Sequence, residues 1–263
     1  MASNDTKTSE VLTGEINEGN PVWRQSSPRG AGRLTPGWLA LWIMGIRSRF
    51  SPPAPWVVLL GLDGSGKSTV LEALEKIFSP PSFAGVQVIN RHPGFLYARW
   101  LYSKTSTNHP SDEPNPIEHY GKPSHGIIKS MAKLGILAVD WLAGYWGRTV
   151  QQRAKGHLVL FDRHFFLDVV IDPLRYRYGG PLWFARLMGR LLPGPDLVIL
   201  LDASIEVLQS RKEEISLDEA TRQRTAYLEL IQKWPNSHVI DATKPLEQVI
   251  DEAKQAILGY NNS

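Results

Sequence analysis

The sequence predicts an α/β fold in which a five-stranded parallel sheet carries helices on both faces. Short apolar runs alternate along the chain with stretches of helical periodicity, an order that is typical of strand–helix–strand units. Several of these runs are apolar at every position, which indicates strands that are buried on both faces of a sheet. The five expected strands are residues 56–60, 86–90, 158–161, 197–201 and 239–240.

A glycine-rich loop directly after the first expected strand specifies the class of this fold. Residues 61–69 read Gly-Leu-Asp-Gly-Ser-Gly-Lys-Ser-Thr, which fits the pattern G-x-x-x-x-G-K-[ST] of a phosphate-binding loop. A helical stretch with one apolar face follows at residues 68–78. Because phosphate binding by this motif requires a strand before it and a helix after it, the sequence predicts a P-loop NTPase.

The residue types of this loop suit a nucleoside triphosphate. Its glycines permit positive φ angles and a close approach of the backbone to the ligand, so that amide groups point at phosphate oxygens. Lys67 is expected to reach the β- and γ-phosphates, and the Ser68 hydroxyl is expected to hold Mg²⁺. The predicted nucleotide-binding residues are Gly61, Leu62, Asp63, Gly64, Ser65, Gly66, Lys67, Ser68 and Thr69.

Composition narrows the function classes. Of the 263 residues, 42% are apolar, which is enough for a core, and the net charge of +3 does not suggest a nucleic-acid-binding protein. The chain has no cysteine, so disulfides, thiolate metal sites and a cysteine nucleophile are excluded. Its first residues are polar and do not look like a secretory signal, and no apolar run has the length of a membrane span. We therefore expect a cytoplasmic protein.

The chain is expected to divide near residue 52. Residues 1–51 are predicted to be a disordered tail with a short apolar helix, and residues 52–263 a single P-loop domain. The apolar helix, at residues 38–50, has two open interpretations: it packs on the domain, or it lies on a membrane surface with Trp at the interface and Arg facing headgroups. Residues 103–125 are predicted to form a long loop.

Charged residues follow two of the expected strands. Arg91 comes directly after the second strand, and Asp162-Arg163-His164 ends the third. Four apolar residues that run into an acid are similar to a Walker B strand, so Asp162 is expected to lie near the phosphate loop and to hold Mg²⁺. The alternatives are a helix cap for Asp162 and a surface ion pair for Arg163, while His164 is expected to be a packing or loop residue.

Helical periodicity accounts for the rest of the domain. It is expected over residues 126–154, 204–214 and 246–258, with a further helix after the Gly-Gly-Pro turn at 179–181. Ser216 and Glu219 have the spacing of a capping box and are expected to open another helix.

With these motifs in order, residues 54–260 resemble the thymidylate kinase-like family of P-loop nucleoside monophosphate kinases. Asp63 stands inside the loop as it does in that family, and the lid region carries several arginines. The other matching segments are Arg91-His92-Pro93, similar to Arg-Phe-Pro, Asp162-Arg163-His164, similar to Asp-Arg-Tyr, Leu201-Asp202-Ala203 and Ile240-Asp241-Ala242.

The resemblance implies an ATP-dependent kinase that uses Mg²⁺ and transfers the γ-phosphoryl group to a small-molecule acceptor, first of all a dTMP-like nucleoside monophosphate. It implies that Asp63 contacts the sugar hydroxyl of the acceptor and that Arg91 and Arg163 hold the acceptor phosphate. Arg211 would close on ATP, with Arg222 or Arg224 as helpers. The implied catalytic residues are Lys67, Asp162, Arg163 and Arg211, and the implied metal ligands are Ser68 and Asp162. Since thymidylate kinases are commonly dimeric, a homodimer is also expected.

Two departures leave the acceptor open. The family places an arginine on its long helix where this chain has Trp141, and residues 171–181 are not those of an ordinary thymidylate kinase. This segment resembles divergent bacterial members often found with surface-polysaccharide genes, so the acceptor could instead be a sugar or a surface-polysaccharide precursor. A non-catalytic nucleotide-binding regulatory protein is a further alternative. A GTPase has no support, because no Asn-Lys-x-Asp motif is present.

Overall fold

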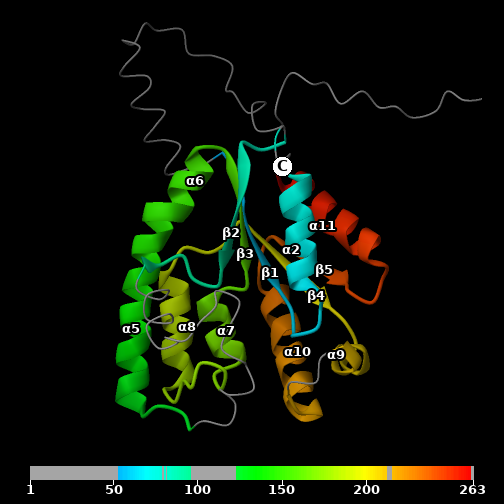
Figure 1. Cartoon of the computed structure of the whole chain (residues 1–263). Helices are drawn as coiled ribbons and strands as arrows, with labels where there is room; N and C mark the ends of the chain where they lie inside the picture. The colour runs from blue at the N-terminus through cyan, green and yellow to red at the C-terminus, as the bar shows by residue number, and fades with distance from the viewer. Residues whose placement is uncertain (1–52, 79, 81, 96–122, 212–214, 262–263) are drawn as a thin grey trace, which may run out of the picture.

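The computed structural model describes residues 53–78, 80, 82–95, 123–211 and 215–261 (Figure 1). The predicted tail and apolar helix within residues 1–51, most of the predicted loop at 103–125, and residues 212–214 lie outside this part of the chain. The proposed division at residue 52 falls at the edge of the described residues and stays a prediction.

The predicted parallel sheet is confirmed. Its five strands lie in the order β2-β3-β1-β4-β5, and all neighbouring pairs are parallel. They are β1 (Trp56–Leu60), β2 (Gly85–Asn90), β3 (His157–Asp162), β4 (Leu197–Asp202) and β5 (Ser237–Asp241). Since β1 has β3 on one side and β4 on the other, the connections leave the centre of the sheet in both directions, and ligands bind at the carboxyl end of such a switch point.

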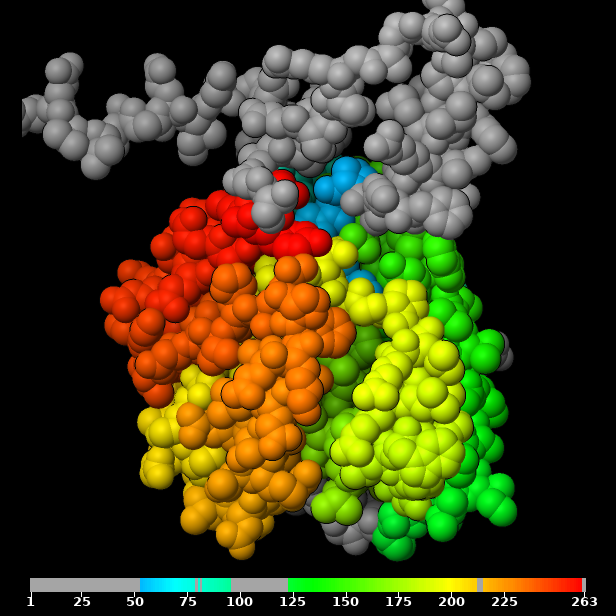
Figure 2. Space-filling view, turned by 180° about the vertical axis from the view of Figure 1, so that it is seen from behind, coloured from blue at the N-terminus to red at the C-terminus, as the bar shows by residue number. Residues whose placement is uncertain are grey.

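Helices cover both faces of the sheet (Figures 1 and 2). On one face of the sheet, α2 packs against β2, β3 and α11. In the view of Figure 2, α10 and α8 border a groove, and α7 lies at its floor. The helices before the third strand are α2 (Lys67–Ile77), α5 (Ile127–Gly144), the π-helix η2 (Tyr145–Thr149) and α6 (Val150–Ala154). Those after it are α7 (Phe165–Ile171), α8 (Leu182–Leu191), α9 (Ile205–Arg211), α10 (Leu217–Gln232) and α11 (Leu246–Asn261).

The core explains why the central strands are apolar throughout. Every residue of β1 is buried, because helices cover both of its faces. The Trp56 ring packs against the rings of Trp141 and Phe161, at centroid distances of 5.7 and 5.1 Å. Aromatic pairs at such distances add to the burial of their apolar surface, so α5 is fastened to the sheet at this point.

Three local features differ from the sequence prediction. The helix expected over 126–154 is interrupted by η2, and α7 was not predicted. The capping box is only half formed: Ser216 accepts the Glu219 N–H at 3.4 Å, while the Glu219 carboxylate accepts from Arg222 and Gln223 instead.

Across the described residues, no helix combines the length and apolar character that a bilayer-spanning segment requires.

Candidate active site

The phosphate loop joins β1 to α2 and has the predicted backbone. Gly61 has a φ of +148°, and a Cβ there would lie 2.6 Å from the Leu201 carbonyl oxygen and 2.7 Å from Ser65 Oγ. Gly66 has a φ of +85° and directly precedes α2. Both positions therefore require glycine, the first for space and the second for its left-handed conformation.

Lys67 lies folded along this loop. Its Nζ donates to the Leu62 carbonyl at 2.7 Å and to Ser65 Oγ at 3.3 Å. Burial and the nearby Arg163 lower the pKa of Lys67 to about 7, against the opposite effect of neighbouring carboxylates. The ammonium group is thus held inside the loop where a bound phosphate would supply the counter-charge.

Asp162 and Ser68 are suitable ligands for Mg²⁺. Asp162 ends β3 and pairs with Leu59, just before the loop, and its Oδ1 is buried without a hydrogen-bond partner in the described part of the chain. Ser68 is exposed in the first turn of α2. No three His, Asp or Glu side chains of the described residues converge on a metal position. One carboxylate and one hydroxyl that share the ion with phosphate oxygens and water are typical of Mg²⁺ sites, so these residues fit the ion.

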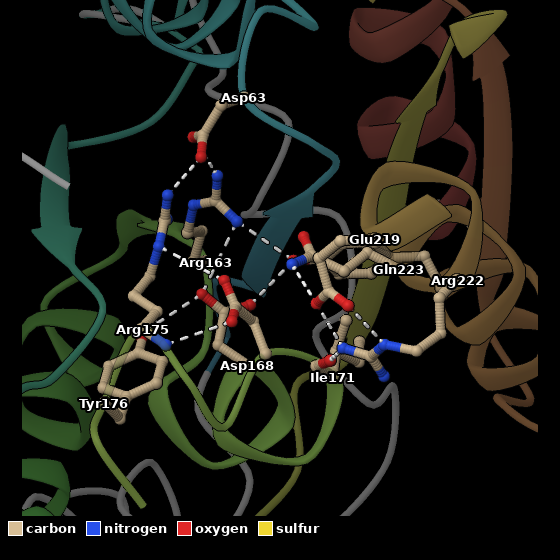
Figure 3. A network of polar contacts seen from close by, with 11 residues as sticks. Asp63, Arg163, Asp168, Ile171, Arg175, Tyr176, Glu219, Arg222 and Gln223 are labelled. Atoms are coloured by element: carbon tan, nitrogen blue, oxygen red, sulfur yellow. Dashed lines mark hydrogen bonds and ion pairs between the residues drawn. The ribbon is translucent and has the colours of Figure 1, made fainter. Parts of the chain in front are cut away.

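Asp63 connects the loop to two arginines (Figure 3). Arg163 Nη2 donates to Asp63 Oδ1 at 2.5 Å, and Arg175 Nη2 donates to Asp63 Oδ2. Burial alone would raise the pKa of Asp63, but Arg163, Arg175 and Lys67 together hold it well below its ordinary value. Asp63 is therefore ionised, and each of its oxygens faces one guanidinium.

Arg163 is held from behind by residues of α7, α10 and the segment after α7. Its Nη1 donates to the Tyr227 hydroxyl at 3.0 Å and lies 3.6 Å from Asp168 Oδ2. Tyr227 in turn donates to Asp168 Oδ1 at 3.0 Å, and Tyr176 donates to Asp168 Oδ2 at 3.2 Å. Since Arg163 is only 4% exposed, these contacts fix its guanidinium rather than leave it on the surface, as the alternative interpretation required.

Arg91 and Arg163 share an unusual backbone conformation. Their φ angles are +56° and +66°, in the left-handed region that favours glycine. Arg91 N–H donates to the Asp162 carbonyl at 3.0 Å, and the Arg91 carbonyl accepts from Phe165 N–H at 3.0 Å. These bonds tie the ends of β2 and β3 together, and such strained positions cluster at functional sites.

The predicted lid arginines lie against the domain in three different ways. Arg211 is exposed and its Nη1 donates to the Ala242 carbonyl at 3.2 Å. Arg224 forms a forked pair with Asp202 at 2.8 and 2.7 Å, and Arg222 donates to the Ile171 carbonyl at 2.7 Å. None of these contacts joins them to Lys67, so closure of Arg211 on ATP stays a prediction.

Trp141, which stands where the family has an arginine on its long helix, faces the core. Trp141 is fully buried, with its ring 5.3 Å from that of His164. His164 is also buried, which lowers its pKa to about 4 and keeps it neutral, in agreement with its expected packing role.

Three residues of the site were missed by the sequence analysis: Arg175, Asp168 and Tyr227. The one available signal was Asp168, an acidic residue inside the apolar run Phe165-Phe166-Leu167-Asp168-Val169-Val170. A charge at such a position requires a partner, because an isolated buried carboxylate is very unfavourable. Arg175 and Tyr227 carried no such local signal.

Similarity to known proteins extends over most of the chain. No model of a known protein family matches it. It is 26% identical over 212 residues to the probable thymidylate kinase 1 of Saccharolobus solfataricus, covering 76% of this chain and 95% of that one. It is also 26% identical over 219 residues to the thymidylate kinase of Photobacterium profundum, covering 78% and 96%. The crystal structure of thymidylate kinase from Ehrlichia chaffeensis superposes with a TM-score of 0.51 at 16% identity, over 78% of this chain and 98% of that one.

Over most of its length, the chain is similar in sequence to thymidylate kinases. The structural likeness supports the fold alone, whereas the sequence likeness extends over nearly the whole length of the curated relatives.

Proposed function

We propose that this protein is an ATP-dependent kinase that phosphorylates a nucleoside monophosphate, with dTMP as the first acceptor to test. The observation that carries the proposal is the contact between Asp63 and Arg163. It joins the loop suited to the phosphates of the donor directly to an arginine suited to the phosphate of the acceptor. The names of the relatives, which are thymidylate kinases, support the same acceptor.

In this proposal the protein acts by positioning and charge. Loop amides and Lys67 hold the β- and γ-phosphates of ATP, and Arg91 and Arg163 hold the acceptor phosphate in line with them. Ser68 and Asp162 would hold Mg²⁺, which supplies neutralisation of the phosphate charge when bound. An acceptor phosphate oxygen attacks the γ-phosphorus and ADP leaves, so no side-chain nucleophile is needed.

Formation of ADP in the presence of MgATP and a panel of nucleoside monophosphates tests the proposal. We expect dTMP to stimulate ADP formation, and Lys67→Ala to lower it by about 100-fold or more, because the ammonium stabilises charge that develops on the transferred group. Lys76→Ala, at an exposed position in the last turn of α2, is the matched control and should keep full activity. If no monophosphate raises ADP formation above the Lys67→Ala background, the chain is better described as a nucleotide-binding regulatory protein.

A kinase of another acceptor is the second candidate. It is favoured by Trp141, which lies in the core, and by α5, which contains no arginine along its length. Sugars and phosphorylated sugars in the same assay separate the two candidates, since only the second predicts turnover without any nucleoside monophosphate.

A further inference from the structure

We infer that Arg175 binds the phosphate of the acceptor together with Arg163, so that the acceptor is a phosphate monoester held between two guanidiniums. The inference rests on the proposed kinase function and names the class of its acceptor. It assigns a binding role to the segment after α7, where the sequence analysis placed none.

The first argument is the geometry around Asp63 (Figure 3). Arg163 and Arg175 each direct one Nη2 at a different oxygen of the same carboxylate. Two adjacent oxygens of a phosphate present a similar pair of acceptors, which is why arginine forks bind carboxylate and phosphate alike. Asp63 therefore occupies a place that a phosphate oxyanion could take.

The second argument is access. The Arg163 and Arg175 side chains are 5% and 7% exposed, whereas that of Asp63 is 28% exposed. Solvent thus reaches this group of residues mainly at the carboxylate. An anion that entered there would meet both guanidiniums, and Asp63 would have to turn aside and release them.

The third argument is that Arg175 is anchored. Its backbone N–H donates to Asp172 Oδ1 at 3.1 Å, and its Nε lies 3.5 Å from Asp172 Oδ2. The next residue, Tyr176, is bound to Asp168, and Gly179 N–H donates to Ser130 Oγ of α5 at 3.0 Å. A side chain held in this way loses little conformational freedom when it binds an anion.

Aromatic and hydroxyl-bearing side chains lie next to Arg175 in the sequence and around it. Tyr176 lines a small pocket together with Phe165 and Ser130. An acceptor phosphate at Arg175 would therefore have an aromatic and hydroxyl-bearing pocket one residue away. The long helix α5 contains no arginine, and the segment after α7 adds the Arg175 guanidinium to those of Arg163 and Arg91.

Binding of inorganic phosphate to the full chain tests this inference without knowledge of the acceptor. The phosphate loop is first saturated with a non-hydrolysable ATP analogue and Mg²⁺, so that phosphate does not bind there, and the affinity is measured by calorimetry. Arg175→Met should weaken phosphate binding by about tenfold or more, since it removes a charge-assisted pair. The phosphate affinity of Arg175→Lys should lie between those of the wild type and Arg175→Met. Arg190→Met, at an exposed position of α8, should keep the affinity of the wild type.

Asp63→Asn should change the affinity in the opposite direction. It removes the carboxylate that competes for both guanidiniums, so phosphate should bind more tightly than to the wild type. Phosphate that binds equally well to wild type and to folded Arg175→Met would overturn the inference, as would a wild type that binds none or an Asp63→Asn variant that binds less. If Arg175→Met does not fold, the comparison of Arg175→Lys with the wild type decides.

The failure of this inference differs from that of the proposed function. If the wild type phosphorylates a monophosphate but Arg175→Met keeps the same KM for it, the inference fails and the kinase function stands. If the phosphate affinities follow the expected order and no phosphate-bearing acceptor is turned over, the kinase function fails while the anion site stands.

Discussion

At the scale of single residues, His92 shows how neighbours select one protonation state. Its Nδ1 accepts from Gly94 N–H at 2.9 Å, and its Nε2 lies 3.1 Å from the Leu137 carbonyl. A carbonyl only accepts, so the ring carries its proton on Nε2 and is neutral. Burial lowers its pKa to about 4, although the Leu137 carbonyl and Asp140 act in the opposite direction.

This predicts a loss of stability in acid. The unfolded chain binds the proton below pH 6.5 and the folded chain only near pH 4, so folding becomes less favourable as pH falls between these values. The contribution approaches about 3 kcal/mol. Denaturant titrations at pH 7 and pH 4 should show a smaller loss for His92→Gln than for the wild type. Equal losses of stability in the two proteins would mean that His92 does not resist protonation. The buried His164 is present in both proteins, so its own contribution to the loss cancels in the comparison.

Local sequence was sufficient for some residues and not for others. Gly61, Gly66 and Lys67 were predicted because their roles depend on neighbours within a few positions, and the structure gives the glycines the expected backbone. Arg175 was missed because its partner Asp63 is 112 residues away in sequence. No spacing rule reports such a contact, since it exists only after the sheet has formed.

At the scale of elements, the hydroxyl of Tyr227 connects α10 to α7 and to Arg163. Tyr227 of α10 donates to Asp168 of α7 and accepts from Arg163 at the end of β3. Because α10 follows the predicted lid segment, this hydroxyl links that part of the chain to the arginine proposed to hold the acceptor. Loss of the hydroxyl should therefore affect Arg163 more than the fold.

Tyr227→Phe should lower kcat for the acceptor by about tenfold, since one buried hydrogen bond to a charged group contributes about 1.5 kcal/mol or more. Tyr176→Phe is the matched comparison: it also loses a bond to Asp168, but none to Arg163, and should cost less activity. Steady-state kinetics and thermal unfolding on both variants are the measurements. Equal effects of the two substitutions would show that Tyr227 does not orient Arg163.

The interruption of the long helix also belongs to this scale. At Gly144, just before η2, a Cβ would lie 2.3 Å from the Pro93 backbone, so α5 and the segment after β2 are in contact there. The sequence predicted one continuous helix because the residues of η2 continue its helical pattern. A π-turn depends on what packs against the helix, and the sequence around it carries no signal of its own.

At the scale of the whole molecule, the strand order brings the site together. Residues from the ends of β1, β2 and β3 meet because these strands are parallel and their carboxyl ends share one edge. Asp162 lies beside Leu59, so the proposed metal ligand is next to the phosphate loop although Leu59 and Asp162 are 103 positions apart in the chain.

The N-terminal extension is outside the described residues, and its role can be tested on the whole protein. If residues 38–50 form a membrane-surface helix, removal of residues 1–50 should abolish sedimentation with anionic liposomes, because the buried Trp side chains and the Arg charges would both be lost. ADP formation by the shortened chain should be unchanged, which is the control for folding. Equal sedimentation of both chains would instead favour a helix that packs on the domain.

The sequence alone predicted the parallel sheet and the phosphate loop, because strand periodicity and the spacing of Gly61 to Thr69 are local properties of the chain. Tertiary structure decided that Trp141 lies in the core, that Asp168 and Tyr227 hold Arg163, and that Arg175 shares Asp63 with it. The contacts of Arg163 with Tyr227 and of Asp63 with Arg175 join residues that are 64 and 112 positions apart. They arise from the order of parallel strands, which the sequence pattern does not specify.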